Sequence, residues 1–200
     1  MTDELSADVA AGQAVYSPAV LGMYDLLVLG LSNRWIWKCP TPRLLAFYNQ
    51  HVTANHLDVG VGTGYFLDRC TFPDSPRVAL VDLNPNSLAV TAKRIRRYAP
   101  AVYRRNALEP LQLDGEPFTS IGVNYLLHCL PGDISSKSVV FDHLLDHLAP
   151  EGVIFGSTLL GQGIERSSMA RRLMTFYNRK GVFSNTADDP QSLTAELCRR

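Results

Sequence analysis

The chain has 200 residues, of which 46% are hydrophobic, and its 19 Lys and Arg side chains balance 19 Asp and Glu side chains. This length fits one domain with a substantial buried core, so neither a disulfide nor a metal is needed to hold the fold. The hydrophobic content excludes a disordered chain, and the zero formal charge argues against a protein that binds nucleic acid.

The cysteines and the N-terminus point to the cytoplasm. Four cysteines are scattered along the chain without a CxxC pair, which is typical of reduced thiols. Three acidic residues among the first eight give the wrong charge for a secretory signal. The most apolar stretch, 18–32, is interrupted by Asp25 and is shorter than the roughly 20 apolar residues that span a bilayer. We predict a cytoplasmic protein without a membrane segment.

Short apolar runs alternate with amphipathic stretches along most of the chain. Residues 1–52 are predicted to form an N-terminal helical cap rich in aromatic side chains. Five runs then have the length and two-sided hydrophobicity of buried parallel strands: 56–59, 77–82, 101–104, 118–125 and 152–160. This alternation predicts an α/β fold with a doubly wound, mostly parallel, Rossmann-like sheet.

The predicted helices lie between and after these runs. One begins at the capping sequence Asn84-Pro85-Asn86-Ser87 and continues to Ile95. A second is predicted to open at Ser135-Ser136 and to carry apolar residues as far as Leu148. Helical patterns follow the fifth run from Glu165 to Asn178 and again from Gln191.

The first apolar run leads directly into three glycines at alternate positions. Gly60, Gly62 and Gly64 follow Asp58, and such glycines permit a tight turn and a close approach of the backbone to a ligand. The spacing is not GxGxxG, because Tyr65 stands at the third glycine position, and no P-loop Lys follows. Asp82 ends the second run, where a carboxylate can accept hydrogen bonds from both hydroxyls of a ribose. The pattern predicts a site for an adenosine-containing ligand.

This ordered set of motifs resembles the class I S-adenosylmethionine-dependent methyltransferases of the small-molecule type. The matching positions are the Asp58-to-Gly64 loop, Asp82, Asn106-Ala107, the strand end near Asn124, and residues 148–152. The last segment is similar to the family's L-x-P-G-G turn, with Glu151 in place of the first glycine. The resemblance covers roughly residues 40 to 160 and implies one methyltransferase domain, with a cap (1–52), a cofactor-binding core (53–160), and a lid helix with the start of a last helix (161–200).

The resemblance also implies a cofactor, S-adenosylmethionine, with S-adenosylhomocysteine as its product. No metal is predicted: His143 and His147 have the spacing of two ligands, but no third ligand is evident. The glycine loop would line the methionine part of the cofactor, and Asp58 would orient the loop and the amino acid end. Asp82 would hold the ribose, and Leu83 would pack on the adenine. Asn106 stands where the family often has Asp near the adenine amino group, and an Asn carbonyl can still accept there. The full set of cofactor-binding candidates is Tyr16, Tyr24, Asp58, Gly60, Val61, Gly62, Thr63, Gly64, Asp82, Leu83, Asn106, Ala107 and Asn124.

The methyl acceptor is predicted to be a small apolar or aromatic molecule, covered by the N-terminal cap and the lid. In-line displacement mainly needs alignment of acceptor and methyl group, so the sequence forces no catalytic residue. His128 follows the fourth run and is the candidate general base; packing in the turn is the competing interpretation. Two alternatives stay open: a module that binds the cofactor without catalysis, and a methyltransferase acting on protein or RNA.

The number of strands is the last expectation from the sequence. The family usually has seven, and only five can be placed in these 200 residues, so a C-terminal strand hairpin is expected to be missing. The fifth strand would then have an uncovered edge. We expect low solubility, a compensating arrangement, or a homodimer that pairs through this edge.

Overall fold

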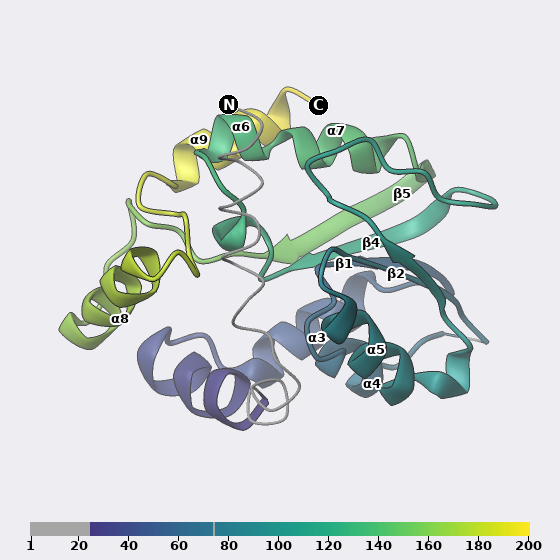
Figure 1. The fold of residues 1–200 in the computed structure, drawn as a ribbon, viewed down its shortest axis with the longest axis horizontal. Coiled ribbons are helices and arrows are strands. Elements are labelled where there is room, and N and C mark those ends of the chain that lie inside the picture. The colour runs from purple at the N-terminus through teal and green to yellow at the C-terminus, as the bar shows by residue number, and fades with distance from the viewer. Residues whose placement is uncertain (1–24, 74) are drawn as a thin grey trace.

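The computed structural model of the protein describes residues 25–73 and 75–200, and its centre is a parallel sheet (Figure 1). The strands are β1 (Asn55–Val59), β2 (Arg77–Asp82), β3 (Ala101–Arg104), β4 (Phe118–Asn124) and β5 (Leu148–Ser157). They lie in the order β3-β2-β1-β4-β5, and every neighbouring pair is parallel. The predicted doubly wound α/β sheet is confirmed, with all five described strands parallel.

Helices cover both faces of the sheet (Figure 1). One layer contains α3 (Thr41–His51), α4 (Tyr65–Arg69) and α5 (Pro85–Arg94), with the short η2 (Arg96–Tyr98) after α5. The other contains α6 (Ile134–Lys137), α7 (Val139–Leu145) and α9 (Pro190–Cys198), and the short η3 (Leu127–Cys129) follows β4. Because side chains alternate along a strand, a hydrophobic core forms on each face of the sheet. Leu57 and Val59 pack with Leu144 of α7 on one face. Leu80 packs with Leu67 and Leu88 on the other.

Two further helices lie beyond the arrowhead of β5, at the carboxyl ends of the strands (Figure 1). The π-helix η1 (Asp25–Ile36) belongs to the predicted cap, and α8 (Ser168–Arg179) to the predicted lid. Helices were expected in both segments, while the division at residues 52 and 160 remains a prediction.

The helix predicted from Ser135 to Leu148 is wrong in two respects. It is split into α6 and α7 at Ser138, and it ends at Leu145. Its start is set by Asp133, whose side chain accepts the Ser136 N–H in a reciprocal capping box. Leu148 instead begins β5, because it pairs with Phe118 of β4. Four residues of β5 therefore precede its predicted start.

The turn that resembles L-x-P-G-G forms an irregularity inside β5. Phe118 pairs with Leu148 and Ser120 with Val153, so β5 has more residues than β4 between these two pairs, as in a β-bulge. Glu151 lies there with a φ of 61°, a left-handed conformation that suits glycine. The Glu151 side chain therefore strains the backbone at this turn.

In the described part of the chain no strand follows β5, which pairs only with β4. None of the helices described there has the length and apolar character needed to cross a membrane.

Candidate active site

A cleft opens at the carboxyl ends of β1, β2 and β4. Its lining includes each candidate cofactor residue that the structure describes: Asp58, Gly60, Val61, Gly62, Thr63, Gly64, Asp82, Leu83, Asn106, Ala107 and Asn124. Tyr16 and Tyr24, predicted to fold over the cofactor, lie outside the described residues. The fold therefore brings residues from 58 to 124 into one cleft, while their contacts with a cofactor stay predictions.

The glycine loop is held from both sides. Gly60 N–H donates to the Val81 carbonyl of β2 over 2.8 Å, and the Thr91 hydroxyl of α5 donates to the Gly62 carbonyl over 3.2 Å. Gly62 and Gly64 have φ values of 53° and 71°. A Cβ on Gly64 would lie 2.7 Å from the Thr91 side chain, whereas one on Gly62 would project into open space. Glycine is thus needed at 64 for helix packing, and at 62 it leaves the cleft free for a ligand.

Asp82 lies at the end of β2, beside β1, and forms part of the cleft wall. The Asn84 N–H donates to its Oδ1 over 2.8 Å, and main-chain N–H groups of Gly62 and Val61 also donate to the carboxylate. Burial raises the pKa of Asp82 to about 6, although these three donors oppose the rise. The carboxylate is therefore desolvated but pre-oriented, as a group that receives ligand hydroxyls needs to be.

Asn124 carries an unused hydrogen-bond donor at the end of β4. Its Oδ1 accepts from the Ser157 hydroxyl over 3.0 Å, whereas its Nδ2 is buried and has no hydrogen-bond partner within residues 25–73 and 75–200. A buried donor without a partner costs about 1–3 kcal/mol. Asn124 also lines the cleft, so a small turn of its side chain would bring this donor to a ligand oxygen.

Tyr125 is a cleft residue that the sequence analysis missed. Its φ is 58°, unusual for a residue with a bulky side chain, and such strain often marks functional sites. Its hydroxyl donates to Oδ1 of the fully buried Asn33 in η1, and Asn33 Nδ2 donates to Thr41. Burial raises the pKa of Tyr125, so the phenol stays protonated. The cap is thereby tied to the wall of the cleft.

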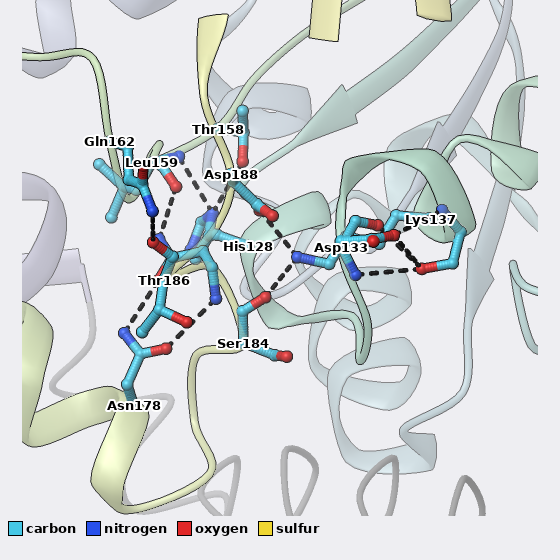
Figure 2. Close-up of polar contacts among 12 residues, drawn as sticks. His128, Asp133, Lys137, Thr158, Leu159, Gln162, Asn178, Ser184, Thr186 and Asp188 are labelled. Carbon is cyan, nitrogen blue, oxygen red and sulfur yellow. Dashed lines mark hydrogen bonds and ion pairs between the residues drawn. The ribbon is translucent and has the colours of Figure 1, made fainter. Parts of the chain in front are cut away.

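His128, the predicted base, is not among the residues that line the cleft. Figure 2 shows it beside Thr158 and Leu159, which follow β5. The ring is 3% exposed, and its Nδ1 accepts from the Leu159 N–H over 3.3 Å. Burial, together with the charge of Lys137, lowers the pKa of His128 to about 3. These contacts describe a packed histidine and do not support its role as a base.

Figure 2 shows that the same region anchors the segment between α8 and α9. Lys137 of α6 and Asp188 form an ion pair of 2.7 Å, with both side chains 1% exposed. Lys137 also donates to the Ser184 carbonyl, and the Ser184 N–H donates to the His128 carbonyl over 2.8 Å. The lid helix is therefore joined to the ends of β4 and β5 through a buried polar cluster.

The donor set of the cleft fits S-adenosylmethionine. Asp82 offers a carboxylate suited to ribose hydroxyls, and the space in front of Gly62 accepts a ligand close to the backbone. Asp58 on β1 and Asn124 at the end of the neighbouring strand β4 also line the cleft. The cleft can therefore take an adenosine at the Asp82 side and a charged amino acid group near β1.

Comparisons with known proteins identify the family. A sequence model of the family described as a methyltransferase domain matches residues 57–154. The chain is 42% identical over 200 residues to demethylluteothin O-methyltransferase of Streptomyces thioluteus, covering 99% of this chain and 87% of the relative. It is 39% identical to the physcion biosynthesis cluster O-methyltransferase of Aspergillus chevalieri, covering 93% and 85% of the two chains.

Solved structures agree on the fold. The N-methyltransferase NodS from Bradyrhizobium japonicum in complex with S-adenosylhomocysteine matches 77% of this chain and 70% of its own, with a TM-score of 0.55 and 16% identity. With this fold, the matching domain and the two relatives, the chain belongs to the class I S-adenosylmethionine-dependent methyltransferases, and S-adenosylmethionine is its methyl donor.

Proposed function

We propose that the protein methylates a hydroxyl oxygen of a small aromatic or enolic molecule, with alignment as its main catalytic contribution. The observation that carries this proposal is the wall after β4. There Asn124, whose Nδ2 has no hydrogen-bond partner among the described residues, adjoins a surface built from Tyr125, Leu126, Leu130 and Pro131. Such a wall suits a flat apolar acceptor with one polar group. Two relatives are named O-methyltransferases, which favours oxygen as the methylated atom.

We assign the described candidates to the cofactor as follows. Asp82 receives the ribose hydroxyls, Leu83 packs on the adenine, and Asn106 with Ala107 borders the adenine edge. The glycine loop lines the methionine part, and Asp58 faces its amino acid end. All these residues line the same cleft, which supports the assignment.

The residues around the acceptor act by orientation. When bound, S-adenosylmethionine would supply an electrophilic methyl group; its transfer to the acceptor oxygen would break the C–S bond, leave the electron pair on sulfur and release the acceptor proton to water. In this proposal the Asn124 side chain turns toward the bound acceptor so that its Nδ2, buried in the free protein, donates to the acceptor oxygen, and Tyr125 fixes the plane of the acceptor. Asp58 and Asp82 serve the cofactor, and the Tyr125 phenol already donates to Asn33. We therefore expect acceptors whose hydroxyl group is itself acidic.

The cap and the lid complete the acceptor site in this proposal. η1 and α8 lie at the same end of the sheet as the cleft (Figure 1). They carry large apolar side chains that are more than half exposed: Leu31, Trp35, Met169 and Phe176. An apolar acceptor between them would cover such side chains.

The test is methyl transfer from isotope-labelled S-adenosylmethionine to paired acceptors, each pair a naphthol and the matching naphthylamine. Labelled methyl on the naphthol, lost in Asp82→Ala, supports the proposal. Faster transfer to the amine, or S-adenosylhomocysteine binding without transfer to any phenol or enol of a wider panel, overturns it.

A homodimer through β5 is the second part of the proposal. In the described chain β5 is a ten-residue strand that pairs on one side only, and unpaired edges promote association. Light scattering over a hundredfold range of protein concentration tests this. A mass that stays monomeric throughout contradicts it.

A further inference from the structure

A buried series of hydrogen bonds runs from β4 to the carboxylate of Asp58. The Tyr48 hydroxyl of α3 lies 2.7 Å from Asp58 Oδ2 and 2.7 Å from His56 Nε2. His56 Nδ1 lies 2.8 Å from the hydroxyl of Ser120 on β4. Tyr48, His56 and Ser120 are at most 1% exposed, and Asp58 is 6% exposed. These four residues come from three elements and meet beneath the glycine loop.

The chemistry of the groups fixes the direction of the series. A carboxylate only accepts, so the single hydroxyl proton of Tyr48 goes to Asp58 Oδ2. The Tyr48 oxygen then accepts from His56 Nε2–H. An imidazole with its proton on Nε2 accepts at Nδ1, so the Ser120 hydroxyl donates there, while it accepts the Thr53 N–H over 3.0 Å. Each donor therefore points toward Asp58.

The state of Tyr48 agrees with this direction. Burial, and then the charge of Asp58, raises the pKa of Tyr48 well above its ordinary value, so the phenol keeps the proton that it donates. Its ring is stacked on Phe66, with centroids 5.6 Å apart, and makes a T-shaped contact with Phe155, with centroids 5.1 Å apart. The hydroxyl is therefore held in place by packing as well as by hydrogen bonds.

Gly122 provides the space that this arrangement needs. It is the β4 partner of Asp58, as Ser120 is of His56. A Cβ on Gly122 would lie 3.1 Å from Asp58 Oδ2 and 3.2 Å from the His56 ring. The carboxylate and the imidazole therefore occupy the place of a side chain on β4.

We propose that Tyr48, His56 and Ser120 are positioning residues that hold the Asp58 carboxylate in the orientation that binds the cofactor. The inference rests on the proposed contact between Asp58 and the amino acid end of the cofactor. Asp58 lies at the start of the glycine loop and lines the cleft, whereas Tyr48, His56 and Ser120 do not line it. They act on the cofactor through Asp58 alone.

The test is calorimetric titration of S-adenosylhomocysteine into Tyr48→Phe, Asp58→Asn and the double variant. Tyr48→Phe removes the donor and should weaken binding about tenfold, as expected for a hydrogen bond to a charged group. The double variant should bind no more weakly than Asp58→Asn. Tyr103→Phe is the control, because its hydroxyl also accepts a hydrogen bond, from the Asp114 N–H, but lies outside the cleft; it should bind as the wild type does.

The outcomes separate this inference from the proposed function. If Asp58→Asn binds S-adenosylhomocysteine like the wild type, the role of Asp58 fails and the inference fails with it. If Asp58→Asn weakens binding while Tyr48→Phe does not, or if the two effects multiply in the double variant, only the inference is overturned.

A second variant decides if Tyr48→Phe does not fold. Ser120→Ala removes the hydroxyl that holds His56 Nδ1, so the ring can turn and its Nε2–H no longer holds the Tyr48 oxygen in line with Asp58. Binding should weaken about threefold although Ser120 lies outside the cleft. Unchanged binding in a folded Ser120→Ala protein overturns the inference.

Discussion

Replacing Asp82 by Asn should stabilise the free protein while it weakens cofactor binding. The Asp82 carboxylate has a pKa of about 6 in the fold, against about 3.9 in an unfolded chain. The folded state therefore binds the carboxyl proton of Asp82 more tightly than the unfolded state does. The stabilising effect of the proton is complete below about pH 4 and is lost as the pH rises through 6.

The magnitude follows from the shift in pKa. Two units correspond to about 3 kcal/mol, which the wild type loses between about pH 4 and pH 6 and the variant does not. In a domain of this size that is about 6–12 °C in Tm. All other titrating groups are shared, so the difference between the two curves of Tm against pH reports Asp82 alone.

Thermal unfolding from pH 4 to pH 7.5, with and without S-adenosylhomocysteine, measures this. Without ligand the two proteins should melt together near pH 4, and the variant should melt higher at pH 7.5. Ligand at a hundred times its Kd should raise the wild type by about 2.7 kcal/mol and leave the variant almost unchanged. Parallel curves across the whole pH range would contradict a raised pKa of Asp82 in the folded protein.

Four further results are expected. The wild-type affinity for S-adenosylhomocysteine should fall about tenfold between pH 7.5 and pH 5 as Asp82 is protonated, and a flat calorimetric profile would contradict this. Glu151→Gly should raise the free energy of unfolding in urea by about 1 kcal/mol by relieving the left-handed φ, and Glu151→Ala should not. Lys137→Met should lose about 3–5 kcal/mol by leaving Asp188 buried and unpaired, and Lys137→Met with Asp188→Leu should regain most of it; equal stability of the two variants would be evidence against the pair. His128→Asn should keep kcat within about threefold, whereas loss of a general base would cost about 10²–10⁴-fold in single-turnover rates.

The part of the site that the sequence predicts is the part made by local geometry. Gly60, Gly62 and Gly64 follow a strand directly, and Asp82 ends the neighbouring strand. The parallel pairing of Asp58 with Leu80 places both strand ends at one edge. A short motif and a strand end are enough to find such a cleft, because the fold class fixes which ends meet.

The missed residues depend on contacts between distant parts of the chain. Asn33 and Tyr125 are 92 residues apart, and the sequence around either residue does not predict their hydrogen bond. From the sequence, Tyr48 is simply an apolar aromatic of the cap. Only the fold shows that Asp58 of β1 lies beside its hydroxyl. The positive φ at Tyr125 could not be predicted from the residue type, because glycine or asparagine is expected in that conformation.

The error over the helix after residue 135 has a similar origin. Leu148 fits the helical spacing as well as it fits a strand, and local pattern does not choose between them. Pairing with Phe118 on β4 decides for the strand. Tertiary contacts thus set the boundary that periodicity left open.

A crystal structure of the protein with S-adenosylhomocysteine tests the account of the cleft most directly. The ribose hydroxyls should lie within hydrogen-bond distance of Asp82, the amino acid end beside Gly62 and Asp58, and the sulfur should face Asn124 and Tyr125. Ribose bound away from Asp82, or a sulfur turned from the wall after β4, would contradict it.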